Sequence, residues 1–231
     1  QFTTLQGGFV PEDEMERAKS TMDEPTFKTE FLADFVSTGN RAAYNFDRKV
    51  HVKQAEELTA NLFWGVDFNV DYMTAVLACE YSDGTIHYFD EIRLSNSNTE
   101  QLAQAMKKVA PNINVFPDSS GRARSTTSNK SDHIILSENS FNVISRKANP
   151  PIIDRLNSLN RMLTDANGKV RMTVDPKCIY LIKDLEQVQR SRDGKIEKLK
   201  DISLTHALDA CSYYIALKHP VVQRLATSSQ W

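Results

Sequence analysis

The sequence is poor in the residues that mark several protein classes. It has only three cysteines, eight glycines and eight prolines among 231 residues. Cys79, Cys178 and Cys211 lie in apolar stretches without metal-ligand spacing, so we expect buried free thiols rather than disulfides or a zinc site. No run of about 18 apolar residues occurs, which argues against a membrane span. Residues 1–4 lack the basic-then-apolar layout of a signal peptide. What remains, 40% hydrophobic and 25% charged residues, is typical of a globular protein.

Charge is nearly balanced in sum but uneven along the chain. The formal net charge is −2, which by itself argues against a DNA-binding protein. Asp and Glu outnumber Lys and Arg over residues 1–118, whereas Lys and Arg are in excess over residues 119–200. This asymmetry is compatible with a basic surface beside an acidic centre. Charges scattered over solvated faces explain it equally well, so charge alone does not decide the function.

The first sixty residues differ from the rest. A helix is predicted to begin at Pro11, with acidic residues in its first turn, and a second one to run over residues 26–36, where the apolar residues form one stripe. Residues 40–60 are expected to be an irregular connector. We therefore predict a helical linker over residues 1–60, an α/β domain over residues 61–220 and a polar tail over residues 221–231.

The α/β domain is predicted from apolar runs, turn residues and helix caps. Strands are expected at residues 62–66, 73–81, 85–94, 113–116, 142–145 and 170–174. Helices are expected at residues 98–109, 131–136, 152–163, 177–188 and 203–218, with a mobile hairpin or loop at 189–200. Three antiparallel strands followed by a helix and a further strand are the opening order of a ribonuclease H-like fold. We therefore expect an α/β protein with a mixed sheet, antiparallel in its first three strands and then parallel, flanked by helices.

Three aspartates stand in positions that favour metal chemistry. Asp67 and Asp118 each follow an apolar strand, and Asp209 lies within an apolar helix. If the two strands are neighbours and the helix packs on the sheet, the three carboxylates converge and repel one another unless a cation lies between them. Oxygen ligands select Mg²⁺ or Mn²⁺, and two such ions suit phosphodiester hydrolysis. An aspartate after a strand also initiates turns, so Asp67 or Asp118 alone would carry little weight.

The sequence around these aspartates resembles a known family. The strings are WGVDF at 64–68, FPDSSG at 116–121 and THALDACSYY at 205–214, supported by FLADF at 31–35, RMTVDPKC at 171–178 and LIKDLE at 181–186. They are similar to the carboxylate motifs and flanking segments of the nuclease domain of tailed-phage terminase large subunits. The resemblance covers nearly the whole chain from about residue 25 onwards.

The resemblance implies a ribonuclease H-like endonuclease that cuts concatemeric double-stranded viral DNA during genome packaging, with Asp67, Asp118 and Asp209 as catalytic metal ligands. It also implies two Mg²⁺ or Mn²⁺ ions, a small terminase subunit and a portal protein as partners, and the host cytoplasm as location. No Gly-x-x-x-x-Gly-Lys-[Ser/Thr] phosphate loop occurs in the sequence. The ATPase motor of such proteins is therefore expected upstream of residue 1.

Further residues have weaker claims on the site. His206 shares a helix face with Asp209 and could hold a metal-bound water or a phosphate, although a half-buried structural histidine is the more frequent case. Asp71 could bind metal through water or start a turn, and Glu91 could approach the site or be an ordinary strand residue. Basic residues expected to contact DNA phosphates are Arg122, Arg124, Lys130, Arg146, Lys147, Arg190 and Arg192, with Lys195, Lys198 and Lys200 in the same late loop.

Three other functions are compatible with parts of the sequence. A junction resolvase or transposase-type nuclease would keep the fold, but the motif at 205–214 and the N-terminal linker argue against it. An actin-like nucleotide-binding domain needs Gly-rich phosphate hairpins, and glycine is too scarce here. A DNA-binding module without catalysis remains open, although the presence of all three aspartates argues against it.

Overall fold

The fold is described by a computed structural model for residues 11–32, 40–55, 57–69, 71–123, 130–191, 195–197 and 201–221. Its strands are β1 (Leu62–Asp67), β2 (Tyr72–Glu80), β3 (Ile86–Ser95), β4 (Asn114–Pro117), β5 (Asn142–Val143) and β6 (Met172–Val174). Its helices are α1 (Glu12–Thr21), α2 (Glu24–Leu32), α3 (Arg48–His51), α4 (Thr99–Val109), α5 (Asp132–Glu138), α6 (Ile152–Leu163), α7 (Ile179–Gln187) and α8 (His206–Lys218), with a 3₁₀ turn, η1, at Ser119–Arg122.

The six strands form one mixed sheet in the order β5-β4-β1-β2-β3-β6. β1, β2 and β3 are antiparallel neighbours, whereas β4 pairs parallel with β1, β5 with β4, and β6 with β3. The predicted mixed sheet is therefore confirmed. The predicted strands at 142–145 and 170–174 are shorter in the structure, because only two and three residues of them join the sheet.

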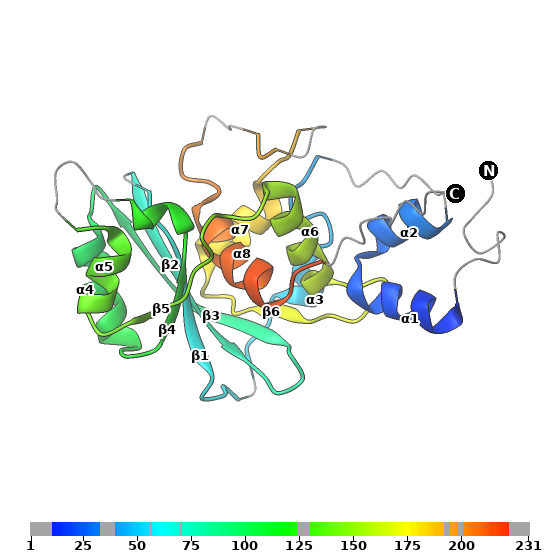
Figure 1. The fold of residues 1–231 in the computed structure, drawn as a ribbon, viewed down its shortest axis with the longest axis horizontal. Helices are drawn as coiled ribbons and strands as arrows, with labels where there is room; N and C mark the ends of the chain where they lie inside the picture. The colour runs from blue at the N-terminus through cyan, green and yellow to red at the C-terminus, as the bar shows by residue number, and fades with distance from the viewer. Residues whose placement is uncertain are drawn as a thin grey trace, which may run out of the picture.

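Helices cover both faces of the sheet (Figure 1). α4 and α5 lie on one face, and α6, α7 and α8 on the other. Each face has its own core of buried side chains, one built around Trp64 and Leu102 and a larger one around Phe63, Leu159 and Ile215. Successive residues of β1 therefore point to opposite cores, as the period of two in a strand requires. β1 lies in the middle of the molecule.

Local sequence explains where helices begin. Asn98 accepts a hydrogen bond from the backbone N–H of Gln101, whose side chain in turn accepts from the N–H of Asn98, so α4 starts with a complete capping box. Ser131 caps α5 in the same way through the N–H of Ile134. α6 spans residues 152–163, as predicted. These helices are set by local signals that are readable in the sequence.

The N-terminal helices pack together and against the body of the protein. Met15, Ala18 and Phe27 form a small cluster that Ala166 joins from the body. α1 confirms the predicted first helix, whereas residues 33–36 of the predicted second helix lie outside the described residues. Figure 1 places α1 and α2 at one end of the molecule, away from β4 and α4.

The predicted irregular connector at 40–60 is more ordered than expected. It contains the short helix α3, and Ala42, Ala43 and Phe46 are buried in the larger core. The side chain of Asn160 on α6 accepts a hydrogen bond from the N–H of Asn45 at 3.0 Å and donates to the carbonyl oxygen of Ala42 at 2.9 Å. Apart from α3 the described part of the segment is irregular, as predicted, and its small residues let it lie directly against α6.

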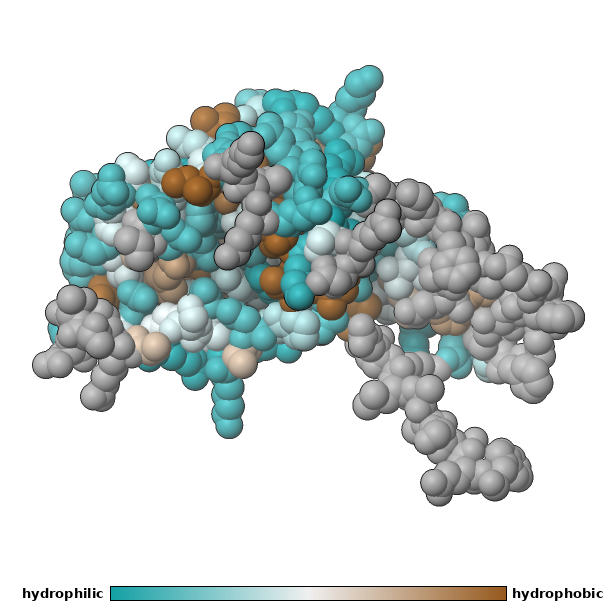
Figure 2. Space-filling view, turned by 90° about the horizontal axis from the view of Figure 1, so that it is seen from above, coloured by the Kyte–Doolittle hydropathy of each residue, from teal (hydrophilic) through white to brown (hydrophobic). Residues whose placement is uncertain are grey.

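Other expectations drawn from composition can be compared with the fold. All three cysteines are buried and free, as predicted. In the part of the chain that the structure describes, no helix is long and apolar enough to cross a membrane. Figure 2 shows one face of the molecule as mainly hydrophilic, with brown areas that are small and separate. Exposed large apolar side chains include Ile179 and Ile202.

Candidate metal and nuclease site

Asp67 and Asp118 lie at the same edge of the sheet. β1 and β4 are parallel neighbours with Val66 opposite Pro117, and each aspartate is the next residue. The backbone N–H of Asp118 donates to the carbonyl oxygen of Val66 at 3.0 Å, which extends the pairing by one step. Parallel strands end at one edge, so the predicted juxtaposition of these two residues follows from the topology.

A glycine in β1 brings the third aspartate to this edge. α8 packs on β1 and β2, and a Cβ atom at Gly65 would lie 2.2 Å from the carbonyl oxygen of Ala210. Only a residue without a side chain allows the helix backbone to approach the strand this closely. Asp209, next to Ala210, is thereby placed beside β1, together with His206 and Tyr213 on adjacent turns.

The start of α8 is held by a residue that sequence reasoning missed. Asp184 on α7 is 2% exposed and accepts the N–H groups of Ala207 and Leu208 at 2.9 and 3.1 Å. Burial raises the pKa of Asp184 to about 6, although these hydrogen bonds oppose the shift. Thr205, just before the helix, has a φ of 86°, a strained conformation for a β-branched residue. α7 therefore fixes the first turn of α8, where His206 lies.

Asp67 is nearly buried and bound by two side chains of α8. It is 7% exposed, with Oδ2 3.0 Å from Nδ1 of His206 and Oδ1 accepting from the Tyr213 hydroxyl at 3.3 Å. Nε2 of His206 lies 3.0 Å from the carbonyl oxygen of Ile202. The imidazolium form of His206 can donate to both of these oxygens. Burial lowers the pKa of His206, but its hydrogen bond to Asp67 and the charge of Asp67 outweigh burial and raise it.

Asp209 forms an ion pair with an arginine from α6. Nη1 of Arg155 lies 2.7 Å from Oδ1 of Asp209 and 2.8 Å from the hydroxyl of Ser212, and the guanidinium stacks 4.8 Å from the ring centre of Tyr213. The Arg155 side chain is 8% exposed. Burial raises the pKa of Asp209 to about 6, and the nearby charge of Asp67 adds to the shift while Arg155 opposes it. Arg155 was not singled out in the sequence, although a charge among apolar helix residues is the same signal that marked Asp209.

Asp118 is held by its own loop. Its two oxygens accept from the backbone N–H of Ser120 at 2.8 Å and from the Ser120 hydroxyl at 2.9 Å, and Asn149 donates to Oδ1. Its carbonyl oxygen lies 2.7 Å from Nε2 of His133. Asn149 was missed because it lies 31 residues further along the chain, after β5.

The three carboxylates suit a hard divalent ion in kind, but their present arrangement is not that of a metal site. Oxygen-only donors are the ligands that Mg²⁺ and Mn²⁺ prefer. Within the described residues, no three His, Cys, Asp or Glu side chains lie close enough together to hold an ion. Asp209 is paired with Arg155 instead, and Asp67 contacts His206. An ion would have to compete with these internal partners.

The two auxiliary carboxylates have different positions. Asp71 is exposed in the turn between β1 and β2, close in sequence to the site. Glu91 on β3 accepts the backbone N–H groups of Tyr180 and Leu181 at 2.7 and 2.9 Å, so its carboxylate holds the first turn of α7 against the sheet. Burial raises the pKa of Glu91, and the two N–H groups oppose that shift.

The basic residues divide into two groups. Arg122 and Arg146 lie near Asp118: Arg122 donates to the carbonyl oxygen of Ser145 at 2.8 Å, and Arg146 lines a small hollow with Ser119, Asn149 and Tyr213. Arg146 also donates to the last turn of α8 through the carbonyl oxygen of Ala216, at 2.9 Å, and Lys147 beside it is exposed.

The second group engages other parts of the surface. Lys130 forms an ion pair with Glu138 at 2.7 Å, and the guanidinium of Arg190 lies 4.8 Å from the ring centre of Tyr44. Arg190 and Ile196 form an isolated antiparallel bridge within residues 189–200, where a hairpin or loop was predicted. Arg124, Arg192, Lys198 and Lys200 lie outside the described residues.

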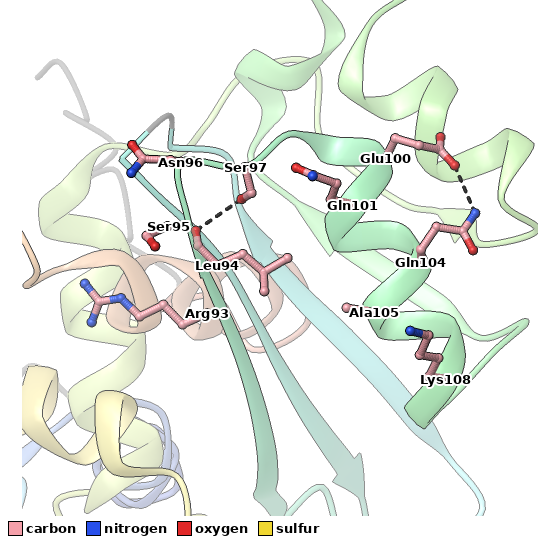
Figure 3. A pocket seen from close by; sticks show the side chains of 10 residues that line it. All are labelled: Arg93, Leu94, Ser95, Asn96, Ser97, Glu100, Gln101, Gln104, Ala105 and Lys108. Carbon is pink, nitrogen blue, oxygen red and sulfur yellow. Dashed lines mark hydrogen bonds between the residues drawn. The ribbon is translucent and has the colours of Figure 1, made fainter.

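A separate groove of about 590 Å³ lies between the end of β3 and α4 (Figure 3). Leu94 points across it towards α4, while Gln101 and Gln104 lie on the helix side. Glu100 and Lys108 both line it, so its charges offset each other. Arg93 points away from α4 and donates to the carbonyl oxygen of Ser203, before α8. None of Asp67, Asp118 and Asp209 lines this groove.

Comparison with solved structures identifies the fold. The large terminase of a thermophilic bacteriophage superposes with a TM-score of 0.69 at 14% identity, over 94% of this chain and 55% of that one. The nuclease domain of the P22 large terminase superposes with a TM-score of 0.61 at 16% identity, over 80% of this chain and 96% of that domain. The chain shares the fold of these terminase nucleases. The predicted ribonuclease H-like fold is thereby confirmed.

The likeness to solved structures covers only part of a large terminase and has low sequence identity. The chain spans about half of the thermophilic phage's large terminase, 55% of its length. The yeast mitochondrial Holliday junction resolvase Ydc2 matches with a TM-score of 0.37 at 12% identity, too low to support an argument for that alternative. No protein-family model matches the sequence, and no curated protein does. Identities this low establish a shared fold, and the activity has to be argued from the residues of the site.

Proposed function

We propose that the chain is the metal-dependent endonuclease domain of a viral terminase large subunit, which cuts concatemeric double-stranded DNA during genome packaging. One observation carries the proposal. In the fold shared with the P22 nuclease domain, Asp67, Asp118 and Asp209 come from three separated segments to one edge of the sheet. Burial and the charge of Asp67 raise the pKa of Asp209 against the opposing charge of Arg155, and carboxylates with raised pKa values gather at functional sites.

In this proposal Asp67, Asp118 and Asp209 hold Mg²⁺ or Mn²⁺, with two ions in the working site. The chemistry that such ions would supply is the activation of a water molecule and the stabilisation of the leaving oxygen of the phosphodiester. Tyr213 and His206 orient Asp67 through its two oxygens. Ser120 and Asn149 orient Asp118. The proposal gives no metal-binding role to Asp71, which lies in a turn, or to Glu91, which caps α7.

The DNA is proposed to run over the end of β4, where Arg122, Arg146 and Lys147 lie close to Asp118. Such contacts bind the phosphate backbone without reading sequence.

The structures of the thermophilic phage's large terminase with bound ADP and ATP-γ-S support an ATPase domain in the same polypeptide as a partner. A small terminase subunit, a portal protein and the host cytoplasm belong to the same proposal. A junction resolvase would need the same site but branched DNA, and a non-catalytic module would bind DNA without cutting it.

A plasmid-cleavage assay tests the function. We expect nicking and linearisation with Mn²⁺ or Mg²⁺ and none with EDTA, because the carboxylates need a cation to act on a phosphodiester. Asp67→Ala and Asp209→Ala should both abolish cleavage. Equal cutting of linear duplex and of a four-way junction supports the terminase assignment, whereas strong preference for the junction would favour a resolvase. DNA binding without cleavage under any metal would favour the non-catalytic module.

The pKa of Asp209 predicts how cleavage depends on pH. Its folded pKa of about 6 lies above the value of about 3.9 in an unfolded chain. Protons therefore compete with metal below pH 6, and cleavage should fall about fivefold between pH 6 and pH 5, as the ionised fraction of Asp209 does. The same shift stabilises the fold below pH 3.9, a contribution lost as pH rises through 6. The loss of cleavage at pH 5 should thus occur without unfolding, which circular dichroism at each pH will check. A flat profile down to pH 5 would contradict the assignment of Asp209.

A further inference from the structure

Arg155 stands out among the residues around the site. It comes from α6, and α8 carries Asp209, so the ion pair joins two helices on the same face of the sheet. Its guanidinium contacts Asp209 and Ser212 through one nitrogen and stacks on Tyr213, whose hydroxyl donates to Asp67. One side chain is therefore connected to two of the three carboxylates.

The hydrogen bonding of Arg155 is incomplete. Its Nε atom is buried, and no partner for it exists among the described residues, as is also the case for Arg93 and Arg161. What sets Arg155 apart from these two is its ion pair with a carboxylate of the site. Here the guanidinium is held chiefly through the negative charge of Asp209. A charge kept in place by one carboxylate is a counter-ion to that carboxylate.

Two of the three carboxylates have a basic partner within the protein. Asp67 contacts His206, and Asp209 is paired with Arg155. No third acidic, histidine or cysteine side chain of the described chain closes on either pair to complete a metal site. Arginine stays charged at any pH at which proteins fold, so Asp209 has a permanent cation beside it.

From these contacts, and resting on the proposed nuclease function, we infer that Arg155 is the resident counter-ion of Asp209 and competes with the divalent ion for this carboxylate. Arg155 lets the domain fold without metal and lowers its affinity for metal. An isolated domain therefore binds its ions weakly. A positive charge beside a divalent ion weakens binding strongly at this range, since charges a few ångströms apart interact by several RT even when partly screened.

Metal affinity and thermal stability of Arg155→Met test this inference. Methionine keeps the apolar stem and removes the charge. Titration with Mn²⁺ at pH 8 should show binding about tenfold tighter than in the wild type. The metal-free variant should melt at a lower temperature, because Asp209 is left buried without a partner, and Mn²⁺ should raise its melting temperature by more than that of the wild type. Arg155→Lys, which keeps the charge, should restore wild-type affinity.

Arg161→Met is the matched control. Arg161 lies on the same helix, is partly buried, and donates to the carbonyl oxygen of His219 rather than to the site. Its replacement should lower the melting temperature equally with and without Mn²⁺. If Arg155→Met does not fold without metal, folding on addition of Mn²⁺ supports the inference, and a chain that stays unfolded in Mn²⁺ overturns it.

The outcomes separate the inference from the function on which it rests. Unchanged or weaker Mn²⁺ binding by Arg155→Met overturns the counter-ion role, while wild-type cleavage of plasmid DNA leaves the nuclease intact. Loss of the wild-type Mn²⁺ signal in Asp67→Asn ties the measured binding to the site. If neither the wild type nor Arg155→Met binds Mn²⁺, the proposed function and the inference both fail.

Discussion

Asp118→Asn will reduce Mn²⁺-dependent cleavage of plasmid DNA at least about a thousandfold without unfolding the domain. Asparagine has nearly the same shape as aspartate and keeps an oxygen that can accept from Ser120 and an amide that can rotate beside Asn149. What is lost is one negative charge among the three that we assign to the metal. Initial rates of nicking will measure the loss of cleavage, and the far-ultraviolet circular dichroism of each protein will show that the variant is folded.

Asp175→Asn is a suitable control for this substitution. Asp175 also follows a parallel strand, β6, and its carboxylate accepts the N–H of the residue two positions later, Lys177, at 3.0 Å. It therefore makes the same local turn as Asp118. β6 ends opposite Tyr88 of β3, however, whereas Asp67 of β1 pairs with Thr74 of β2, which in turn pairs with Arg93 of β3. Because Tyr88 precedes Arg93 along β3, Asp175 lies further than Asp67 from the edge of the sheet that carries the site. Cleavage by Asp118→Asn at near the wild-type rate would remove Asp118 from the site.

Gly65→Ala will destabilise the domain by about 3 kcal/mol and abolish most cleavage. The new methyl group would meet the carbonyl oxygen of Ala210 at 2.2 Å and a methyl of Val76 at 3.2 Å. The first neighbour is helix backbone, which cannot rotate away, so α8 has to move off β1. Asp209 and His206 move with it, and the distances between the carboxylates change. Urea denaturation and the plasmid assay will measure the two consequences.

Gly168→Ala separates this close approach from the general effect of replacing glycine. Gly168 has a φ of 77°, so alanine is strained there, but apart from its chain neighbours none of the described residues has an atom within 4 Å of the added methyl. Its cost should be about 1 kcal/mol, with cleavage unchanged. Comparable losses in the two variants would show that backbone conformation, rather than the contact with α8, is responsible at Gly65.

Much of the fold could be predicted from local patterns. The apolar runs at 62–66 and 113–116 and the helix starts near 98 and 131 each depend on a few neighbouring residues, and the structure has its elements there. The position of Asp67 beside Asp118 followed from one further assumption, that these two strands are parallel neighbours. The connector at 40–60 was less predictable, because its contacts with Asn160 join residues 115 apart in sequence.

Most of the strands and helices could be recognised in the sequence, as could the three aspartates that follow or interrupt apolar segments and whose motifs resemble those of a nuclease. Periodicity and capping are local, so they can be read without the fold. The partners of those aspartates come from distant parts of the chain and appear only in the folded protein: Arg155 on Asp209 across 54 residues, and His206 on Asp67 across 139. The state of each carboxylate is set by burial and by charges within a few ångströms, and those neighbours exist only once α6 and α8 are packed on the sheet.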